Sequence, residues 1–223
     1  MPVSSLVSAP LEYAPDGDCW ATLVFAHGAG AGRQHAFMVQ TAAALAAQGV
    51  AVTLFDFPYM AEGRRLPDRM PRLISAFVDV AGAVHEARQS LPLFAGGKSL
   101  GGRVATHVAA DLHAALPSLA GVVALGYPLR PPSARRPQDR TSHLPHLTAP
   151  LLIVQGTRDA FGGPDSVAAA LTEAGVSRST VIPVADADHS FRVPVRSTRT
   201  QDESDAVWQQ AVVAWMRAHA VRP

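Results

Sequence analysis

The stretch PLFAGGKSLGGRVATHV, residues 92–108, decides the fold. A short apolar run ends in glycines, and a segment with helical character begins directly after Ser99. The pattern Gly97-x-Ser99-x-Gly101 between a strand and a helix is typical of a nucleophile elbow, a tight turn that holds its serine in a strained backbone geometry. Glycines two residues away on each side let the strand and the helix approach closely. The pattern therefore predicts that the Ser99 hydroxyl is exposed at the carboxyl end of a strand.

The same stretch permits two other interpretations. It could be a glycine-rich turn that carries a solvated serine with no chemical role. The letters Gly97-Lys98-Ser99 also match the end of a phosphate-binding loop, but that motif needs another glycine five residues before Gly97. Pro92 stands there instead, which argues against this loop.

Length and composition fit one globular domain. The chain has 223 residues, of which 48% are hydrophobic, and a chain of this size buries about 70% of the surface that it exposes when unfolded. Segments with helical periodicity alternate with short β-branched runs, which favours an α/β fold with a mostly parallel sheet and helices on both faces. Strands are predicted over 21–26, 50–57, 91–95, 119–126, 150–155 and 179–184, and helices over about 35–48, 70–90, 100–115, 165–174 and 203–218. The buried side of the last helix is expected to carry Val207, Trp208, Val212, Trp215 and Met216. We expect residues 1–223 to form a single domain.

Charge and cysteine content exclude several classes of protein. The formal net charge is +1, too balanced for a nucleic-acid-binding surface. Cys19 is the only cysteine, so no internal disulfide can form, which favours a reducing compartment. The first residues carry no secretion signal, and no apolar run is long enough to cross a membrane. These features predict a cytoplasmic protein that binds neither nucleic acid nor membrane.

A second glycine-rich segment, HGAGAG at residues 27–32, follows a predicted strand. Its backbone N–H groups can point at a common spot, and we expect the N–H of Ala29 and that of Leu100 to form an oxyanion hole. His27 is interpreted as a residue that shapes this loop. A plain flexible loop is an alternative, and a dinucleotide-binding loop is a weaker one because Arg33 stands where its last glycine would be.

Two further polar side chains follow predicted strands later in the chain. Asp159 comes after the strand at 150–155, and His189 comes after the strand at 179–184. If the strands are parallel, both side chains lie at the same edge of the sheet as Ser99. A serine nucleophile needs an imidazole to take its proton and a carboxylate to fix the imidazole tautomer. The order Ser99, Asp159, His189 therefore predicts a catalytic triad of the α/β-hydrolase type.

Other acids and histidines could enter such a site. Asp165, Asp186 and Asp188 are alternative acids for the triad. His143 and His146 lie three residues apart, but no carboxylate or cysteine nearby completes a ligand set. We therefore expect neither a metal nor a cofactor.

Four segments together resemble the α/β-hydrolase superfamily over nearly the whole chain: FAHGAGAG, GGKSLGGR, LLIVQGTRDAFG and DADHSF. They are similar to a small, capless, dienelactone-hydrolase-like branch that also includes a regulatory subunit of a chromatin-acetylating complex. By matching position, the resemblance implies Ser99 as nucleophile, Asp159 as acid and His189 as base, with the amides of Ala29 and Leu100 as oxyanion donors. Dienelactone hydrolases use a cysteine nucleophile, so their lactone specificity is not implied for a chain with serine.

The predicted function is that of a serine hydrolase of carboxylic esters or thioesters, with a small-molecule substrate. No insertion long enough for a large cap separates the strands at 119–126 and 150–155, so we expect an open site walled by the segments 57–68 and 127–147. The arginines of the second segment form either a solvated loop or a rim that attracts an anionic substrate. Two alternatives are a regulatory or binding protein with an unused triad and a peptidase or other acyl-transfer enzyme.

Overall fold

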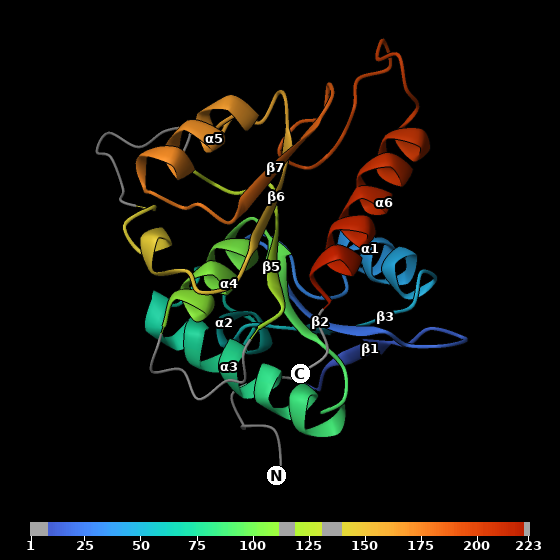
Figure 1. The fold of residues 1–223 in the computed structure, drawn as a ribbon, viewed down its shortest axis with the longest axis vertical. Coiled ribbons are helices and arrows are strands. Elements are labelled where there is room, and N and C mark those ends of the chain that lie inside the picture. The colour runs from blue at the N-terminus through green and yellow to red at the C-terminus, as the bar shows by residue number, and fades with distance from the viewer. Residues whose placement is uncertain (1–8, 112–118, 131–139, 221–223) are drawn as a thin grey trace.

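The protein is described by a computed structural model over residues 9–111, 119–130 and 140–220. Seven strands form one sheet in the order β1-β3-β2-β4-β5-β6-β7 (Figure 1). Strands β2 to β7 run parallel, and β1 pairs antiparallel with β3 at one edge. The strands are β1 (Leu11–Tyr13), β2 (Ala21–Ala26), β3 (Val50–Phe55), β4 (Leu93–Lys98), β5 (Gly121–Leu125), β6 (Leu151–Gly156) and β7 (Ser179–Val184).

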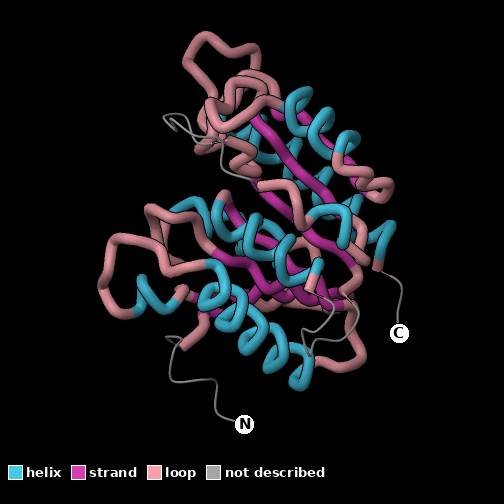
Figure 2. Tube along the Cα trace, turned by 90° about the vertical axis from the view of Figure 1, so that its left-hand side faces the viewer, coloured by secondary structure: helices cyan, strands magenta, loops and turns pink. Residues whose placement is uncertain are grey.

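Helices cover both faces of the sheet (Figures 1 and 2). One apolar core lies between the sheet and helices α3, α4 and α5, and the other lies between the sheet and helices α1 and α6. Each parallel strand therefore contributes side chains to two cores, which explains the nearly unbroken apolar runs in the sequence. The helices are α1 (Ala36–Ala46), α2 (Pro58–Ala61), α3 (Met70–Ala87), α4 (Leu100–Ala110), α5 (Pro164–Glu173) and α6 (Gln201–His219), with a short 3₁₀ helix, η1 (Leu144–His146).

The predicted fold class is confirmed, and most predicted helices and strands lie within a few residues of those in the structure. Two predictions were wrong. Helix α2 lies at the start of a segment expected to be a loop, where Pro58 occupies the first turn, a position that suits proline. Val207 was expected on the buried side of α6 but is 47% exposed. The arginine-rich residues 131–139 and the last part of the helix predicted over 100–115 lie outside the described residues.

No described helix combines the length and the apolar character needed to cross a bilayer.

The elbow depends on the absence of side chains at two glycines. A Cβ on Gly97 would lie 2.6 Å from the carbonyl oxygen of Ala26, and a Cβ on Gly101 would overlap that same oxygen. Helix α4 therefore begins against the ends of β2 and β4 at a distance that only glycine permits. This agrees with the spacing of the sequence motif.

We expect Gly101→Ala to lower the free energy of unfolding by about 3 kcal/mol, the upper end of the usual cost of overpacking. The new methyl group meets backbone, which cannot rotate away. Gly82→Ala is the matched control, because Gly82 lies inside α3 with open space around its Cα, and alanine there should raise stability by about 1 kcal/mol. Urea unfolding measures both changes. Equal stabilities of the two variants would contradict this account of the elbow.

Candidate active site

Ser99 lies in the sharp turn between β4 and α4. Its backbone angles are φ 51° and ψ −112°, a conformation that costs a non-glycine residue free energy and is typical of functional turns. The Ser99 N–H donates a 2.9 Å hydrogen bond to the carbonyl oxygen of Leu125 at the end of β5. This bond and the neighbouring glycines hold the half-buried serine at the carboxyl edge of the sheet.

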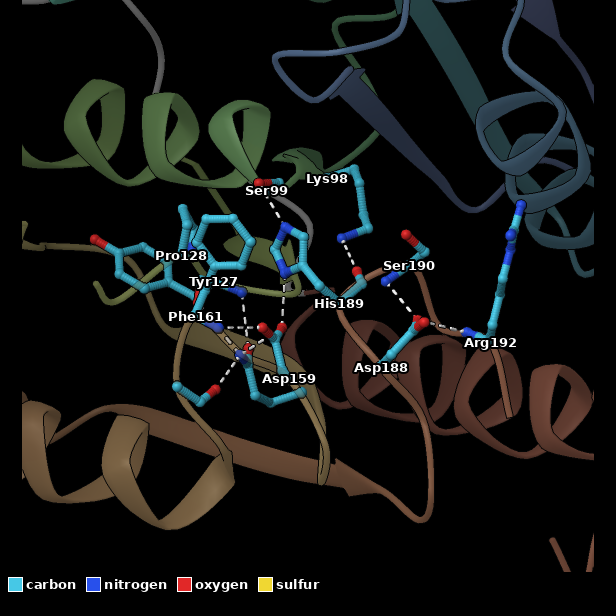
Figure 3. Close-up of polar contacts among 12 residues, drawn as sticks. Lys98, Ser99, Tyr127, Pro128, Asp159, Phe161, Asp188, His189, Ser190 and Arg192 are labelled. Carbon is cyan, nitrogen blue, oxygen red and sulfur yellow. Dashed lines mark hydrogen bonds and ion pairs between the residues drawn. The ribbon is translucent and has the colours of Figure 1, made fainter. Parts of the chain in front are cut away.

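Three of the predicted side chains form one hydrogen-bonded chain (Figure 3). Nε2 of His189 lies 2.9 Å from Oγ of Ser99, and Nδ1 of His189 lies 2.7 Å from Oδ2 of Asp159. The residues come from the ends of β4, β6 and β7, as the parallel sheet requires. The alignment lets the imidazole accept a proton from the hydroxyl while the carboxylate accepts the Nδ1 hydrogen bond.

The alternative acids have other positions in the structure. The carboxylate of Asp186 accepts a 2.9 Å hydrogen bond from the Ser197 hydroxyl. The Asp188 carboxylate accepts backbone N–H groups of its own loop, and Asp165 lies in the first turn of α5. Among the described residues, the His189 ring is hydrogen-bonded to no other carboxylate than that of Asp159.

The Asp159 carboxylate is held by two further donors that sequence analysis did not identify. Its Oδ1 accepts the Phe161 N–H at 2.8 Å, and its Oδ2 accepts Nε2 of Gln155 at 3.0 Å. Gln155 is fully buried, and its Oε1 accepts the Tyr127 N–H at 2.7 Å. These bonds fix the rotamer of the acid. The only sequence signal is an amide side chain near the end of an otherwise apolar strand, because its partner Tyr127 is far away along the chain.

The buried side chain of His27 positions the glycine-rich loop, as expected. His27 is buried, and its Nε2 accepts the Phe57 N–H at 3.0 Å, so the hydrogen of the neutral ring lies on Nδ1, which donates to the Gly28 carbonyl oxygen at 2.7 Å. Burial lowers the pKa of His27, which keeps the ring neutral. The C=O and N–H of one trans peptide point in opposite directions. Holding the Gly28 carbonyl toward His27 therefore turns the N–H of Ala29 away from His27.

The rest of this loop is also anchored. The Tyr59 hydroxyl donates to the Ala29 carbonyl oxygen at 3.1 Å, and burial raises the pKa of Tyr59 to about 12, so the hydroxyl keeps its proton. At the far end of the loop, the Arg33 N–H donates to Oδ1 of Asp56 at 2.7 Å, and the Arg33 guanidinium pairs with the same carboxylate. These contacts hold the loop along its length, which argues against the plain flexible loop of the alternative interpretation.

A cavity of about 350 Å³ lies next to Ser99. Its walls are mostly apolar and come from the glycine-rich loop, the start of α1, and the loops that carry Phe161 and His189. The expectation that segment 57–68 forms a wall was wrong, since none of its residues lines this cavity. No described residue of segment 127–147 lines it either, but residues 131–139 of that expected wall lie outside the described residues. The physical reason is that the first turn of α1 occupies the position next to the serine, while 57–68 begins with α2, which packs on α3.

Lys98 is a further residue that sequence analysis did not place in the site. It lines the same cavity, is 9% exposed, and its Nζ donates to the backbone carbonyl oxygen of His189 at 2.5 Å (Figure 3). In the sequence, Lys98 stands out only within the letters Gly97-Lys98-Ser99, which suggested a phosphate-binding loop. Its partner lies 91 residues away.

Comparison with known proteins identifies the class to which the fold and the site belong. The sequence matches the family of the alpha/beta hydrolase domain over residues 20–217. The chain therefore belongs to the α/β-hydrolase family, and we describe it as a hydrolase.

Solved structures of several hydrolases are similar to this chain. A dienelactone hydrolase from Anabaena variabilis is 25% identical, with a TM-score of 0.70 over 96% of this chain and 92% of that one. An alpha-beta serine hydrolase homologue from Coxiella burnetii is 18% identical, with a TM-score of 0.73 over 92% and 89% of the two chains. A serine hydrolase without a lid from Xanthomonas campestris is 19% identical, with a TM-score of 0.68 over 92% and 88%. A comparison with curated proteins gave no match.

Proposed function

We propose that the protein is a serine hydrolase of carboxylic esters or thioesters, with Ser99 as nucleophile, His189 as base and Asp159 as acid. The continuous hydrogen-bonded chain of these three side chains, with distances of 2.9 and 2.7 Å, carries the proposal. The Ser99 end of this hydrogen-bonded chain lies at a mostly apolar cavity of about 350 Å³, a volume that suits a small or flexible acyl ester.

The reaction proceeds in two acyl-transfer steps. Oγ of Ser99 attacks the substrate carbonyl carbon while Nε2 of His189 takes the hydroxyl proton. The bond to the leaving oxygen or sulfur then breaks, and His189 gives the proton to that atom. A water molecule, deprotonated by His189, attacks the acyl group on Ser99 and releases the carboxylic acid. Asp159 stabilises the imidazolium that forms in each step.

Two backbone amides are proposed to hold the negative oxygen of the tetrahedral intermediate. Leu100 is the first residue of α4, where a backbone N–H has no partner inside the helix and lies at the positive end of the helix dipole. The Ala29 N–H is oriented through the bond from His27 to the Gly28 carbonyl. Ala29 and Ser99 line the same cavity, which supports their joint action on one carbonyl group.

We expect Ala29→Pro to lower kcat about 100- to 1,000-fold, the usual cost of losing one oxyanion donor. Proline has no N–H, so the variant deletes the proposed donor without removing a side chain from the triad. Ala29→Ser keeps the N–H and is the matched control. Steady-state kinetics with an activated ester measures the effect, and similar kcat values for the two variants would rule out Ala29 as a donor.

A substrate panel tests the proposal as a whole. We expect hydrolysis of p-nitrophenyl esters and acyl thioesters, with the rate falling as the acyl chain outgrows the cavity. Inertness toward the panel, together with copurification of one fixed partner, would favour a regulatory protein with an unused triad. Selective turnover of amides would favour a peptidase.

A further inference from the structure

Lys98 is a buried cation in the apolar neighbourhood of the cavity. It ends β4, directly before Ser99, and is 9% exposed. Its Nζ lies 5.2 Å from the ring centroid of Phe191 and 5.8 Å from that of Phe37, within the range of cation–π interaction. Among the ion pairs of the described residues, none includes Lys98. Burying an ammonium group without a paired carboxylate costs free energy, which calls for a functional reason.

Among the described residues, the Lys98 ammonium group makes one hydrogen bond. Its Nζ donates a 2.5 Å hydrogen bond to the backbone carbonyl of His189, whose ring contacts Ser99 and Asp159. The backbone leaves room for this bond at Gly126, where φ is +66° and a Cβ would lie 2.7 Å from Nζ and 3.5 Å from Cε1 of His189. A charged donor gives a stronger hydrogen bond than a neutral one.

The bond from Lys98 holds the loop that carries His189 at that residue. The loop contains two non-glycine residues with left-handed backbone, Asp186 at φ 59° and Phe191 at φ 64°. Other bonds join the loop to the rest of the fold at other residues: the Arg158 N–H donates to the Ala187 carbonyl oxygen, and Nε2 of Gln201 donates to the Phe191 carbonyl oxygen. The bond from Lys98 ties the loop to the strand that ends at the nucleophile.

We propose that Lys98 is a positioning residue for the hydrolytic reaction: its ammonium group holds the main chain of His189 so that the imidazole stays aligned with Ser99. This inference rests on the proposed function. It assigns to Lys98 no contact with the substrate's reacting atoms.

If Lys98 acts through its charge, the rate of the reaction at Ser99 should depend on the protonation of Lys98. A side chain that only fills space would give no such pH dependence. Burial lowers the pKa of Lys98 to about 8, and Asp159 and Asp188 oppose this shift. The other titratable groups near the amine among the described residues are His189 and, on the cavity wall, His35. As pH rises through about 8, the amine loses its proton and becomes a weaker donor, so the reaction at Ser99 should slow.

The lowered pKa of Lys98 also makes the stability of the folded protein depend on pH. The pKa of Lys98 is lower in the folded state than in the unfolded state. Burial of Lys98 therefore lowers the free energy of unfolding by its full amount below about pH 8. This loss becomes smaller as pH rises from about 8 toward 10.5, the ordinary pKa of lysine. Lys98→Met keeps an unbranched side chain, one heavy atom shorter, and removes the charge. We therefore expect this variant to have a higher Tm than wild type at pH 7, with the difference shrinking above pH 8.

The test compares wild type, Lys98→Met and Lys98→Gln by the rate of Ser99 labelling with a fluorophosphonate probe between pH 6 and 9.5, and by Tm. Arg88→Met is the control, because Arg88 is paired with Glu12 far from the site. We expect wild-type and control labelling to slow above pH 8. Labelling of both Lys98 variants should be at least tenfold slower at pH 7 and lack that alkaline decline, while Tm of Lys98→Met rises.

Labelling rates and pH profiles like those of wild type in either folded Lys98 variant would overturn the inference, and so would a wild-type rate that stays constant through pH 8. Slower labelling with a parallel fall in Tm would show a structural role only. Failure of the probe to label wild-type Ser99 at any pH would contradict the proposed function itself. The experiment therefore distinguishes failure of the Lys98 inference from failure of the proposed function.

Discussion

Replacing Ser99 by alanine is expected to lower kcat by about a millionfold, the scale seen when the nucleophile of a comparable triad is removed. The hydroxyl is the proposed nucleophile that forms the acyl intermediate, and Nε2 of its hydrogen-bond partner His189 lies 2.9 Å away. Tm should change little, because the side chain is small and half-buried. Turnover of an activated ester, measured with enough enzyme to detect residual rates, gives the ratio.

Ser166→Ala is the control for this variant, since Ser166 lies in α5 and does not line the cavity beside Ser99. It should keep wild-type kcat. A Ser99→Ala variant that retains more than a few per cent of wild-type turnover would show that the reaction uses another nucleophile.

Asp159→Asn should lower kcat about ten-thousandfold at neutral pH, the loss expected when the imidazole is held in the wrong tautomer. The Phe161 N–H needs the Oδ1 acceptor, so the new amide nitrogen takes the place of Oδ2 and faces Nδ1 of His189. The ring must then accept there and carry its hydrogen on Nε2, where it cannot take the proton of Ser99. The amide nitrogen also faces the donor Nε2 of Gln155.

Asp186→Asn is the matched control for the acid. Asp186 lies in the same loop as His189 and has φ 59°, a conformation that asparagine tolerates. Its kcat should stay within about twofold of wild type. If both variants lost activity equally, the effect would come from the loop and not from the acid beside His189.

Sequence patterns were sufficient for those parts of the protein that depend on neighbours along the chain or on strand order. The spacing of Gly97 and Gly101 reports a close approach of backbone segments that any side chain would block. The positions of Asp159 and His189 follow from one fact, that parallel strands end at a common edge. Neither inference requires knowing which distant segments of the chain pack against each other.

Features that depend on packing between distant segments were missed or wrong. The bonds from Lys98 to His189 and from Gln155 to Tyr127 join residues far apart in sequence, and no local pattern marks them. Val207 is next to the buried Trp208 at the border of the apolar stripe of α6, where helical periodicity does not decide which side chain faces the core. The walls of the cavity depend on which loop reaches the sheet edge, which periodicity does not predict.

The most direct measurement is the site of covalent labelling by a fluorophosphonate probe in the folded protein, located by mass spectrometry of its peptides. The account predicts one adduct per chain, on Ser99, formed by wild type and lost after unfolding or in Ser99→Ala. Absence of an adduct on Ser99 in folded wild-type protein, or equal labelling of other serines, would contradict the central claim that Ser99 is an activated nucleophile.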